Sequence, residues 1–142
     1  MYGLIMKCDG APSRGLLEQA INDVVLSNVA YFIAEWSEGR DPPCCLGCAG
    51  IKHVPDVPSR TAEIVGARGV LQAGQASCQS AAAYFVGRER AIELSKGECP
   101  ESVHSRYRVV LEEKPRADAP GGYWHALAVT PKGIVDVTEE MS

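Results

Sequence analysis

The sequence has no apolar run long enough to cross a membrane. Its longest uninterrupted apolar stretches, residues 29–34 and 81–86, are far shorter than the roughly 20 residues that a membrane-spanning helix needs. The N-terminus also lacks a basic segment followed by an apolar segment and a cleavage site, which are the features of a secretory leader. We therefore expect a soluble, cytoplasmic protein with no membrane partner.

Positive charge is neither abundant nor concentrated in the sequence. The 14 Lys and Arg residues are outnumbered by 18 Asp and Glu residues, the net charge is −4, and most basic residues are interleaved with carboxylates. A nucleic-acid-binding protein would show a basic stripe, so no nucleic-acid partner is expected. The sequence also lacks repeats and a glycine-rich phosphate-binding loop, and it predicts no cofactor.

The length of 142 residues corresponds to a single domain. A chain of this size buries roughly two thirds of its unfolded surface, so a hydrophobic core can form without disulfides. We expect three parts within residues 1–142. These are an N-terminal helix over residues 13–38, a Cys- and Pro-rich loop over residues 39–60, and a core over residues 61–142 that carries the candidate catalytic residues.

Apolar spacing predicts two long helices. In residues 13–38 apolar side chains recur largely every three to four positions, with Ser13 as a plausible N-cap and Gly39 as a stop. The second helix is Ala-rich and begins near Cys78, after a flexible Gly-containing loop. Gly87 is expected to weaken the middle of this helix.

The pattern of apolar residues changes from helical to alternating after Gly97 and Pro100. Alternation and turn signals predict three strands, around residues 107–111, 124–130 and 134–138. Gly121–Gly122 is expected to break the chain between the first two strands, and residues 131–133 form a turn between the last two. Helices followed by strands predict an α+β fold.

Cys78 is the first candidate for chemistry. A thiol attacks as the thiolate, and the partial positive charge at a helix N-terminus favours the thiolate. A cysteine in the first turn of a helix is therefore placed where a reactive cysteine belongs. The alternative interpretation is a buried structural cysteine.

The C-terminal hairpin supplies a second candidate pair. If Thr130 and Gly133 flank the turn, Leu127 lies opposite Asp136, and His125 projects from the same face of the sheet as Asp136. A buried carboxylate and a buried imidazole each need a polar partner, so these two side chains are expected to bind each other. They then form a base and the residue that orients it. The alternative is a solvent-facing pair on the outer side of the sheet.

These residues together resemble a known family pattern. A Gln stands six positions before Cys78, a Ser directly before it and a Ser-Ala pair shortly after it, and a His and an acidic residue follow later in the chain. This order resembles the papain-like cysteine peptidases, and an Asp in the last role is more similar to their transglutaminase-like branch. The resemblance implies that Cys78 is the nucleophile, His125 the base, Gln72 the oxyanion donor and Asp136 the residue that orients His125.

The same resemblance implies a fold and a function. The expected fold is a papain-like or transglutaminase-like core, in which the nucleophile helix packs on a small antiparallel sheet. The expected activity is thiol-dependent hydrolysis or acyl transfer on protein or peptide amides. Position 79 is Gln where papain-type enzymes carry an aromatic residue, and the chain is shorter than a papain domain, so a minimal member is expected.

A different class of function is also open. The chain is similar in general appearance to predicted transglutaminase-like proteins of tailed phages. The alternative is therefore a catalytically silent structural or assembly protein, with protein assembly partners and a place in the virion.

The Cys- and Pro-rich loop holds further candidate ligands, which are Cys44, Cys45, Cys48 and His53. A structural zinc site usually has two ligand pairs, and the sequence has no second Cys-x-x-Cys pair, although Cys8 or Cys99 could complete a set of four ligands. No metal is predicted, and a metal site remains a weak alternative beside a disulfide and unligated thiols. A loop thiol could also be a redox neighbour of Cys78.

Overall fold

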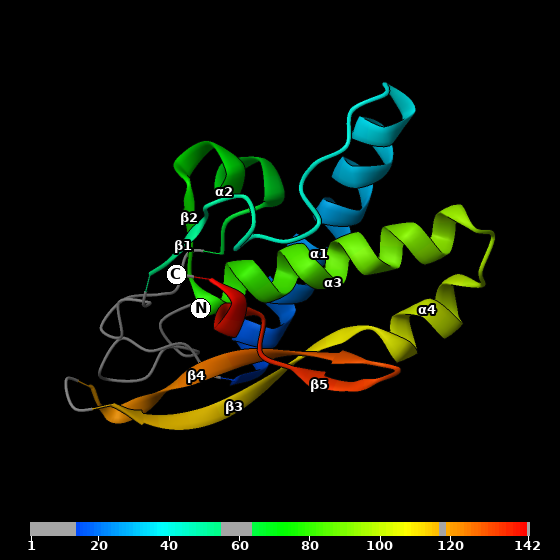
Figure 1. Ribbon diagram of the computed structural model, residues 1–142. Coiled ribbons are helices and arrows are strands. Elements are labelled where there is room, and N and C mark those ends of the chain that lie inside the picture. The colour runs from blue at the N-terminus through cyan, green and yellow to red at the C-terminus, as the bar shows by residue number, and fades with distance from the viewer. Residues whose placement is uncertain (1–13, 55–63, 117–118, 142) are drawn as a thin grey trace.

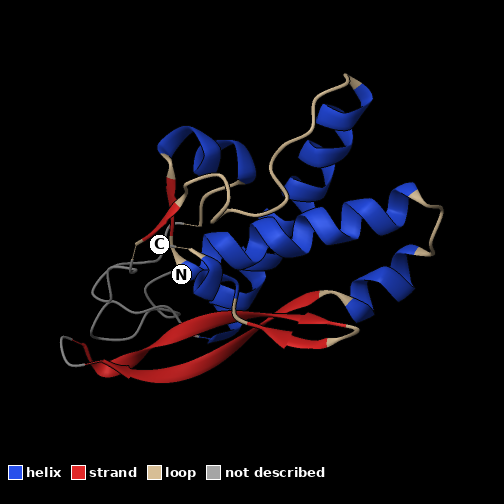
Figure 2. Ribbon diagram, in the orientation of Figure 1, coloured by secondary structure: helices blue, strands red, loops and turns tan. Residues whose placement is uncertain are grey.

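The computed structural model describes residues 14–54, 64–116 and 119–141, which form a group of helices beside a small sheet (Figure 1). The helices are α1 (Arg14–Ser37), α2 (Ala67–Ala73), α3 (Cys78–Ser95) and α4 (Pro100–Arg106), with a 3-10 helix, η2 (Val137–Glu140). The strands are β1 (Lys52–His53), β2 (Gln75–Ala76), β3 (Arg108–Arg116), β4 (Ala119–Thr130) and β5 (Gly133–Val135). Strands β1 and β2 pair in parallel, whereas β3, β4 and β5 form an antiparallel sheet in that order (Figure 2). The expected α+β class is confirmed at this level.

Helix α1 agrees with the helix predicted from apolar spacing. Its buried apolar side chains are those of Leu17, Ile21, Val25 and Phe32, which lie one or two helical turns apart. The helix ends before Gly39, whose φ of 79° is a left-handed conformation that glycine adopts without steric cost. The predicted N-cap, Ser13, lies outside the described residues.

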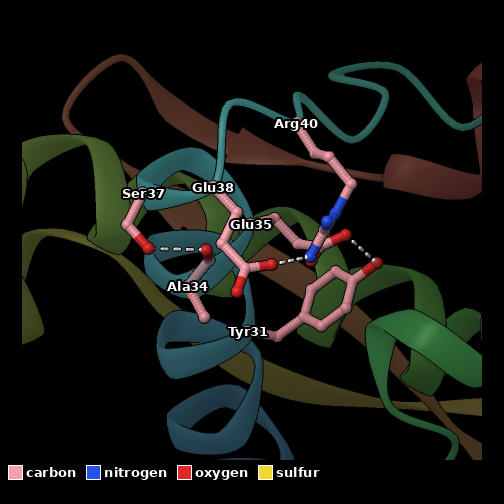
Figure 3. A network of polar contacts seen from close by, with 6 residues as sticks. All are labelled: Tyr31, Ala34, Glu35, Ser37, Glu38 and Arg40. Atoms are coloured by element: carbon pink, nitrogen blue, oxygen red, sulfur yellow. Dashed lines mark hydrogen bonds and ion pairs between the residues drawn. The ribbon is translucent and has the colours of Figure 1, made fainter.

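Charged side chains gather at the C-terminal end of α1 (Figure 3). The Arg40 guanidinium contacts the carboxylates of Glu35, at 2.7 Å, and Glu38, and the Tyr31 hydroxyl donates to Glu35 at 3.4 Å. The Arg40 side chain is 58% exposed, so solvent screens these ion pairs and they add little to stability. They hold the turn around Gly39 and offer no candidate chemistry.

Gly87 allows α1 and α3 to pack closely. A Cβ atom at position 87 would lie 2.5 Å from the Cβ of Asn28 and 3.3 Å from the carbonyl oxygen of Val25. Beside this contact, the rings of Phe32 and Tyr84 meet edge to face with centroids 5.0 Å apart. Helix α3 continues through position 87, so glycine there serves the helix–helix contact.

The structure corrects the predicted loop before Cys78. Helix α2 occupies part of it and ends at Gly74, which is left-handed with φ of 70°. Asn28 on α1 accepts a hydrogen bond from the backbone N–H of Ala67 at 2.8 Å, and so satisfies a donor at the start of α2. The sequence pattern did not indicate α2 because the helix is short and glycines lie before, within and after it.

A second short helix, α4, replaces the extended chain expected after Pro100. Pro100 occupies the first turn of α4, where its missing N–H costs nothing. The buried Arg90 on α3 donates from Nε to the carbonyl oxygen of Tyr107 at 2.7 Å, which ties the end of α4 to the core. The predicted strand does follow, as β3, and Leu111 is its buried residue among those described.

The C-terminal strands differ from the prediction at their ends. Strand β4 runs through Gly121–Gly122 without the expected break. The turn and register are as predicted, because Val129 pairs with Ile134 and Thr130 with Gly133. Strand β5 then stops at Val135 and not at position 138, because the Asp136 side chain caps the 3-10 helix η2.

None of the helices in the described part of the chain has the length and apolar character that a membrane crossing requires.

Candidate active site

Cys78 is the first residue of α3, as predicted. Ser77 is the N-cap, and its hydroxyl oxygen accepts a hydrogen bond from the backbone N–H of Ser80 at 3.3 Å. The Ser80 hydroxyl oxygen in turn accepts from the backbone N–H of Val65 at 2.8 Å. These contacts fix the first turn of an 18-residue helix, whose dipole favours negative charge at the position of Cys78. The Cys78 residue is only 4% exposed.

The predicted pairing of His125 with Asp136 is confirmed. Nε2 of His125 lies 2.8 Å from Oδ2 of Asp136, and the His125 side chain is 7% exposed. His125 projects from strand β4, and Asp136 directly follows strand β5, which pairs with β4. The hairpin register therefore brings the two side chains together, as the spacing of the sequence predicted.

Thr138 is a member of the site that the sequence analysis did not single out. Its backbone N–H and its hydroxyl donate to Oδ1 of Asp136, at 3.1 Å and 2.7 Å. The signal was an Asp followed two residues later by Thr, which is the pattern of a side-chain cap. With Oδ1 held by Thr138 and Oδ2 facing His125, the carboxylate has a fixed orientation.

The hydrogen bonds around Asp136 favour its ionised form. Burial raises the pKa of the Asp136 carboxyl, but the hydrogen bonds from Thr138 and His125 outweigh it and leave the pKa below its ordinary value. An ionised carboxylate only accepts hydrogen bonds, so Nε2 of His125 carries the proton that is donated to it. In a neutral imidazole the other nitrogen, Nδ1, then carries the lone pair, as the predicted role of His125 as a base would require.

This arrangement predicts how acid affects stability. The folded pKa of Asp136 lies below the ordinary value of 3.8, so the native state binds fewer protons than the unfolded state there. The stability that ionised Asp136 contributes to the folded state is present above about pH 4. It is lost as the pH falls through the pKa of Asp136 in the folded state. Melting temperatures of wild type and Asp136→Asn should therefore differ most near neutral pH and converge in acid. A difference that stays constant down to about pH 2 would contradict the assigned pKa shift.

Helix α3 and strand β4 meet next to these residues. Gln79, which is buried and follows Cys78, donates from Nε2 to the carbonyl oxygen of Trp124 at 3.4 Å. Trp124 directly precedes His125. This bond therefore connects the first turn of α3, which carries Cys78, with strand β4, which carries His125. Side chains alternate along β4, and the buried Ala126 and Ala128 face away from the side that His125 occupies.

Gln72, the predicted oxyanion donor, lies near the C-terminal end of α2 and is exposed. No hydrogen bond to its side chain occurs within the described ranges. The structure therefore gives Gln72 a place on a neighbouring helix, and its catalytic role stays a prediction.

The candidate metal ligands of the loop are not gathered into a site. Cys44, Cys48 and His53 are exposed, and Cys45 is half-buried. No cluster of three or more His, Cys, Asp or Glu side chains suited to a metal occurs among residues 14–54, 64–116 and 119–141. Cys8, one possible fourth ligand, lies outside these ranges.

No family model matches the chain, and the searches of curated proteins and of solved structures gave no match. Function is therefore inferred from the residues of the site.

Proposed function

We propose that the protein is a thiol-dependent hydrolase or acyltransferase of papain-like or transglutaminase-like type, acting on protein or peptide amides. The observation that carries this proposal is the contact of 2.8 Å between His125 and an Asp136 carboxylate that Thr138 also holds. An oriented imidazole on a strand beside the first turn of a cysteine-bearing helix is the arrangement that nucleophilic thiol catalysis needs.

The proposed reaction has two steps. Cys78 attacks the substrate carbonyl as the thiolate, after His125 has taken the thiol proton, and the new sulfur–carbon bond gives a tetrahedral intermediate. His125 then gives the proton to the leaving amine, and a thioester on Cys78 remains. Water completes a hydrolysis and an amine completes a transfer, in each case with His125 as the base.

The developing negative charge on the substrate oxygen needs donors. Backbone N–H groups in the first turn of α3 point out of its N-terminus and are suited to this role. The Cys78 N–H is the proposed first donor. Gln72 is the proposed second donor, and it would reach the oxygen from α2.

Brief treatment with iodoacetamide tests the proposal, because the most reactive thiol and the most exposed thiols are then expected to be different cysteines. Cys44, Cys48 and Cys99 are exposed, whereas Cys78 is 4% exposed. If solvent exposure alone determines the rate of alkylation, the three exposed thiols react first. We expect Cys78 to be alkylated first near neutral pH, because its thiol combines the N-terminus of a long helix with a neighbouring base. Peptide mapping by mass spectrometry measures the order.

Labelling of Cys44, Cys48 or Cys99 in the native protein while Cys78 remains unmodified would contradict the assignment of the nucleophile. The denatured protein is the control, because all cysteines should then react at similar rates.

The near-complete burial of Cys78 and His125 favours a second candidate, a catalytically silent structural or assembly protein. In that case the pair of His125 and Asp136 only satisfies two polar groups of the fold. Removing either partner then costs about 1 to 3 kcal/mol of stability, while Cys78→Ala changes no function. Thermal melting and alkylation of the same variants separate the two candidates.

A further inference from the structure

The segment Cys45-Leu46-Gly47-Cys48 forms an ordered turn outside the candidate active site. The backbone N–H of Ala49 bonds to the carbonyl oxygen of Cys45 at 3.1 Å, and that of Ile51 to Leu46 at 3.0 Å. Gly50 closes the turn with a left-handed φ of 78°. The two cysteines are therefore held three positions apart in a tight turn, where Cα atoms are less than about 7 Å apart.

Buried side chains fasten this turn to the protein on both sides. Leu46 is 4% exposed and Ile51 is 5% exposed, and both belong to the hydrophobic core. Just before the turn, the Tyr84 hydroxyl on α3 donates to the carbonyl oxygen of Pro43 at 2.6 Å. Core packing and a hydrogen bond to α3 therefore hold the turn in place against the rest of the protein.

One hydrogen bond places the backbone of Cys48 against the sulfur of Cys45. The backbone N–H of Cys48 donates to Sγ of Cys45 at 3.2 Å. That nitrogen is only three bonds from Cys48's own sulfur, so rotation about the Cα–Cβ bond of Cys48 carries one sulfur toward the other. A disulfide needs Cα atoms about 4.4 to 6.8 Å apart, and residues three positions apart in a tight turn commonly have such a separation.

The two thiols differ in accessibility. Cys48 is exposed and Cys45 is half-buried. The hydrogen bond from the Cys48 backbone N–H holds Sγ of Cys45 beside the backbone of Cys48. An accessible thiol next to a second, half-buried thiol is the arrangement that a thiol–disulfide exchange site requires.

We propose that Cys45 and Cys48 form a thiol–disulfide exchange site whose substrates are accessible disulfides, such as those of low-molecular-weight thiols. The Cys48 thiolate attacks one sulfur of the substrate disulfide, forms a mixed disulfide and releases the first substrate thiolate. The Cys45 thiolate then attacks Cys48 and releases the second. Two protein thiols are oxidised to one disulfide, the substrate is reduced to two thiols, and the two protons pass to these products.

Titration with glutathione disulfide tests this site on the full-length chain. All variants are made in a Cys78→Ser background, so that the result does not depend on the proposed function of Cys78. After the remaining thiols have been blocked with N-ethylmaleimide, we expect intact mass and peptide mapping to show loss of two hydrogens and a peptide linked through Cys45 and Cys48. Dithiothreitol should reverse the change.

Single variants identify the roles of the two cysteines. Cys45→Ser should stop the reaction at the first step, so that glutathione stays attached to Cys48. Cys48→Ser should slow the reaction of the segment with glutathione disulfide by about tenfold or more, because the accessible attacking thiol is gone. Cys99→Ser, which removes an exposed thiol between α3 and α4, is the matched control and should leave the formation of the disulfide unchanged.

Two results would overturn the assignment. One is the accumulation of stable glutathione adducts on Cys44, Cys48 and Cys99 alike, without an internal disulfide. The other is a disulfide that includes Cys44 in place of Cys45. Circular dichroism of each variant verifies that the fold is intact, and the single mixed disulfide expected for Cys45→Ser gives a positive result that unfolding would not produce.

Discussion

Replacing His125 by alanine should slow alkylation of Cys78 at neutral pH by about tenfold or more, because an unassisted thiol with a pKa near 8.5 is only a few per cent thiolate there. The imidazole of His125, with Nε2 bound to Asp136 at 2.8 Å, presents Nδ1 as the proton acceptor in the proposed reaction. Iodoacetamide rates measured across a range of pH by mass spectrometry provide the test. The exposed thiol of Cys99 in the same samples is an internal control and should react at an unchanged rate.

Asp136→Asn should have an intermediate effect. The amide keeps the shape of the side chain but can turn its NH₂ group toward Nε2, and the His125 ring then takes the wrong tautomer. Cys78→Ala should abolish turnover altogether. A Cys78 alkylation rate that is the same in wild type and His125→Ala, and that rises with pH like an ordinary thiol, would rule out a thiolate–imidazole pair and leave only the fold.

The largest expected effect on stability is that of Gly87→Ala. A methyl group at position 87 would lie 2.5 Å from Cβ of Asn28 and 3.3 Å from the backbone oxygen of Val25. Neither atom is at the flexible end of a side chain, so α1 and α3 must separate. We expect a loss of about 1 to 3 kcal/mol in the free energy of unfolding, as for other overpacked cores. Urea denaturation followed by circular dichroism measures it.

Gly15→Ala is the matched control for that substitution. Gly15 also lies in a helix, but a Cβ atom there would meet nothing within 4 Å. The same change should therefore leave stability unaltered or raise it by up to about 1 kcal/mol, because alanine is the better helix former. If Gly87→Ala is as stable as Gly15→Ala, the close approach of α1 and α3 at this point is wrong.

Sequence reasoning succeeded where local rules fix the geometry. The hairpin turn at residues 131–133 fixes which residues of β4 and β5 lie opposite each other. The contact of His125 with Asp136 could therefore be predicted from the amino-acid sequence alone. The start of α3 at Cys78 and the end of α1 before Gly39 were predictable for the same reason, because capping and glycine signals act within a few residues.

Long-range contacts explain what the sequence did not reveal. Helix α2 depends on Asn28, which is distant in the chain and caps its first N–H group. Pro100 indicated a break, but its place in the first turn of α4 makes it a helix start. No local pattern relates Gln72 to Cys78, since α2 and α3 are separate helices, and its role could only be taken from the family resemblance.

The order of elements along the chain also determines when the site is completed during synthesis. Helices α1 and α3 pack on each other, and both leave the ribosome before strands β4 and β5. Residues His125 and Asp136 come together only when the β4–β5 hairpin has formed, and that hairpin is local in sequence and forms quickly. Cys78 therefore leaves the ribosome before its proposed base. A nascent or truncated chain that ends before strand β4 would carry the thiol of Cys78 without the proposed base, and in the proposed mechanism such a chain would have an ordinary, slowly reacting thiol.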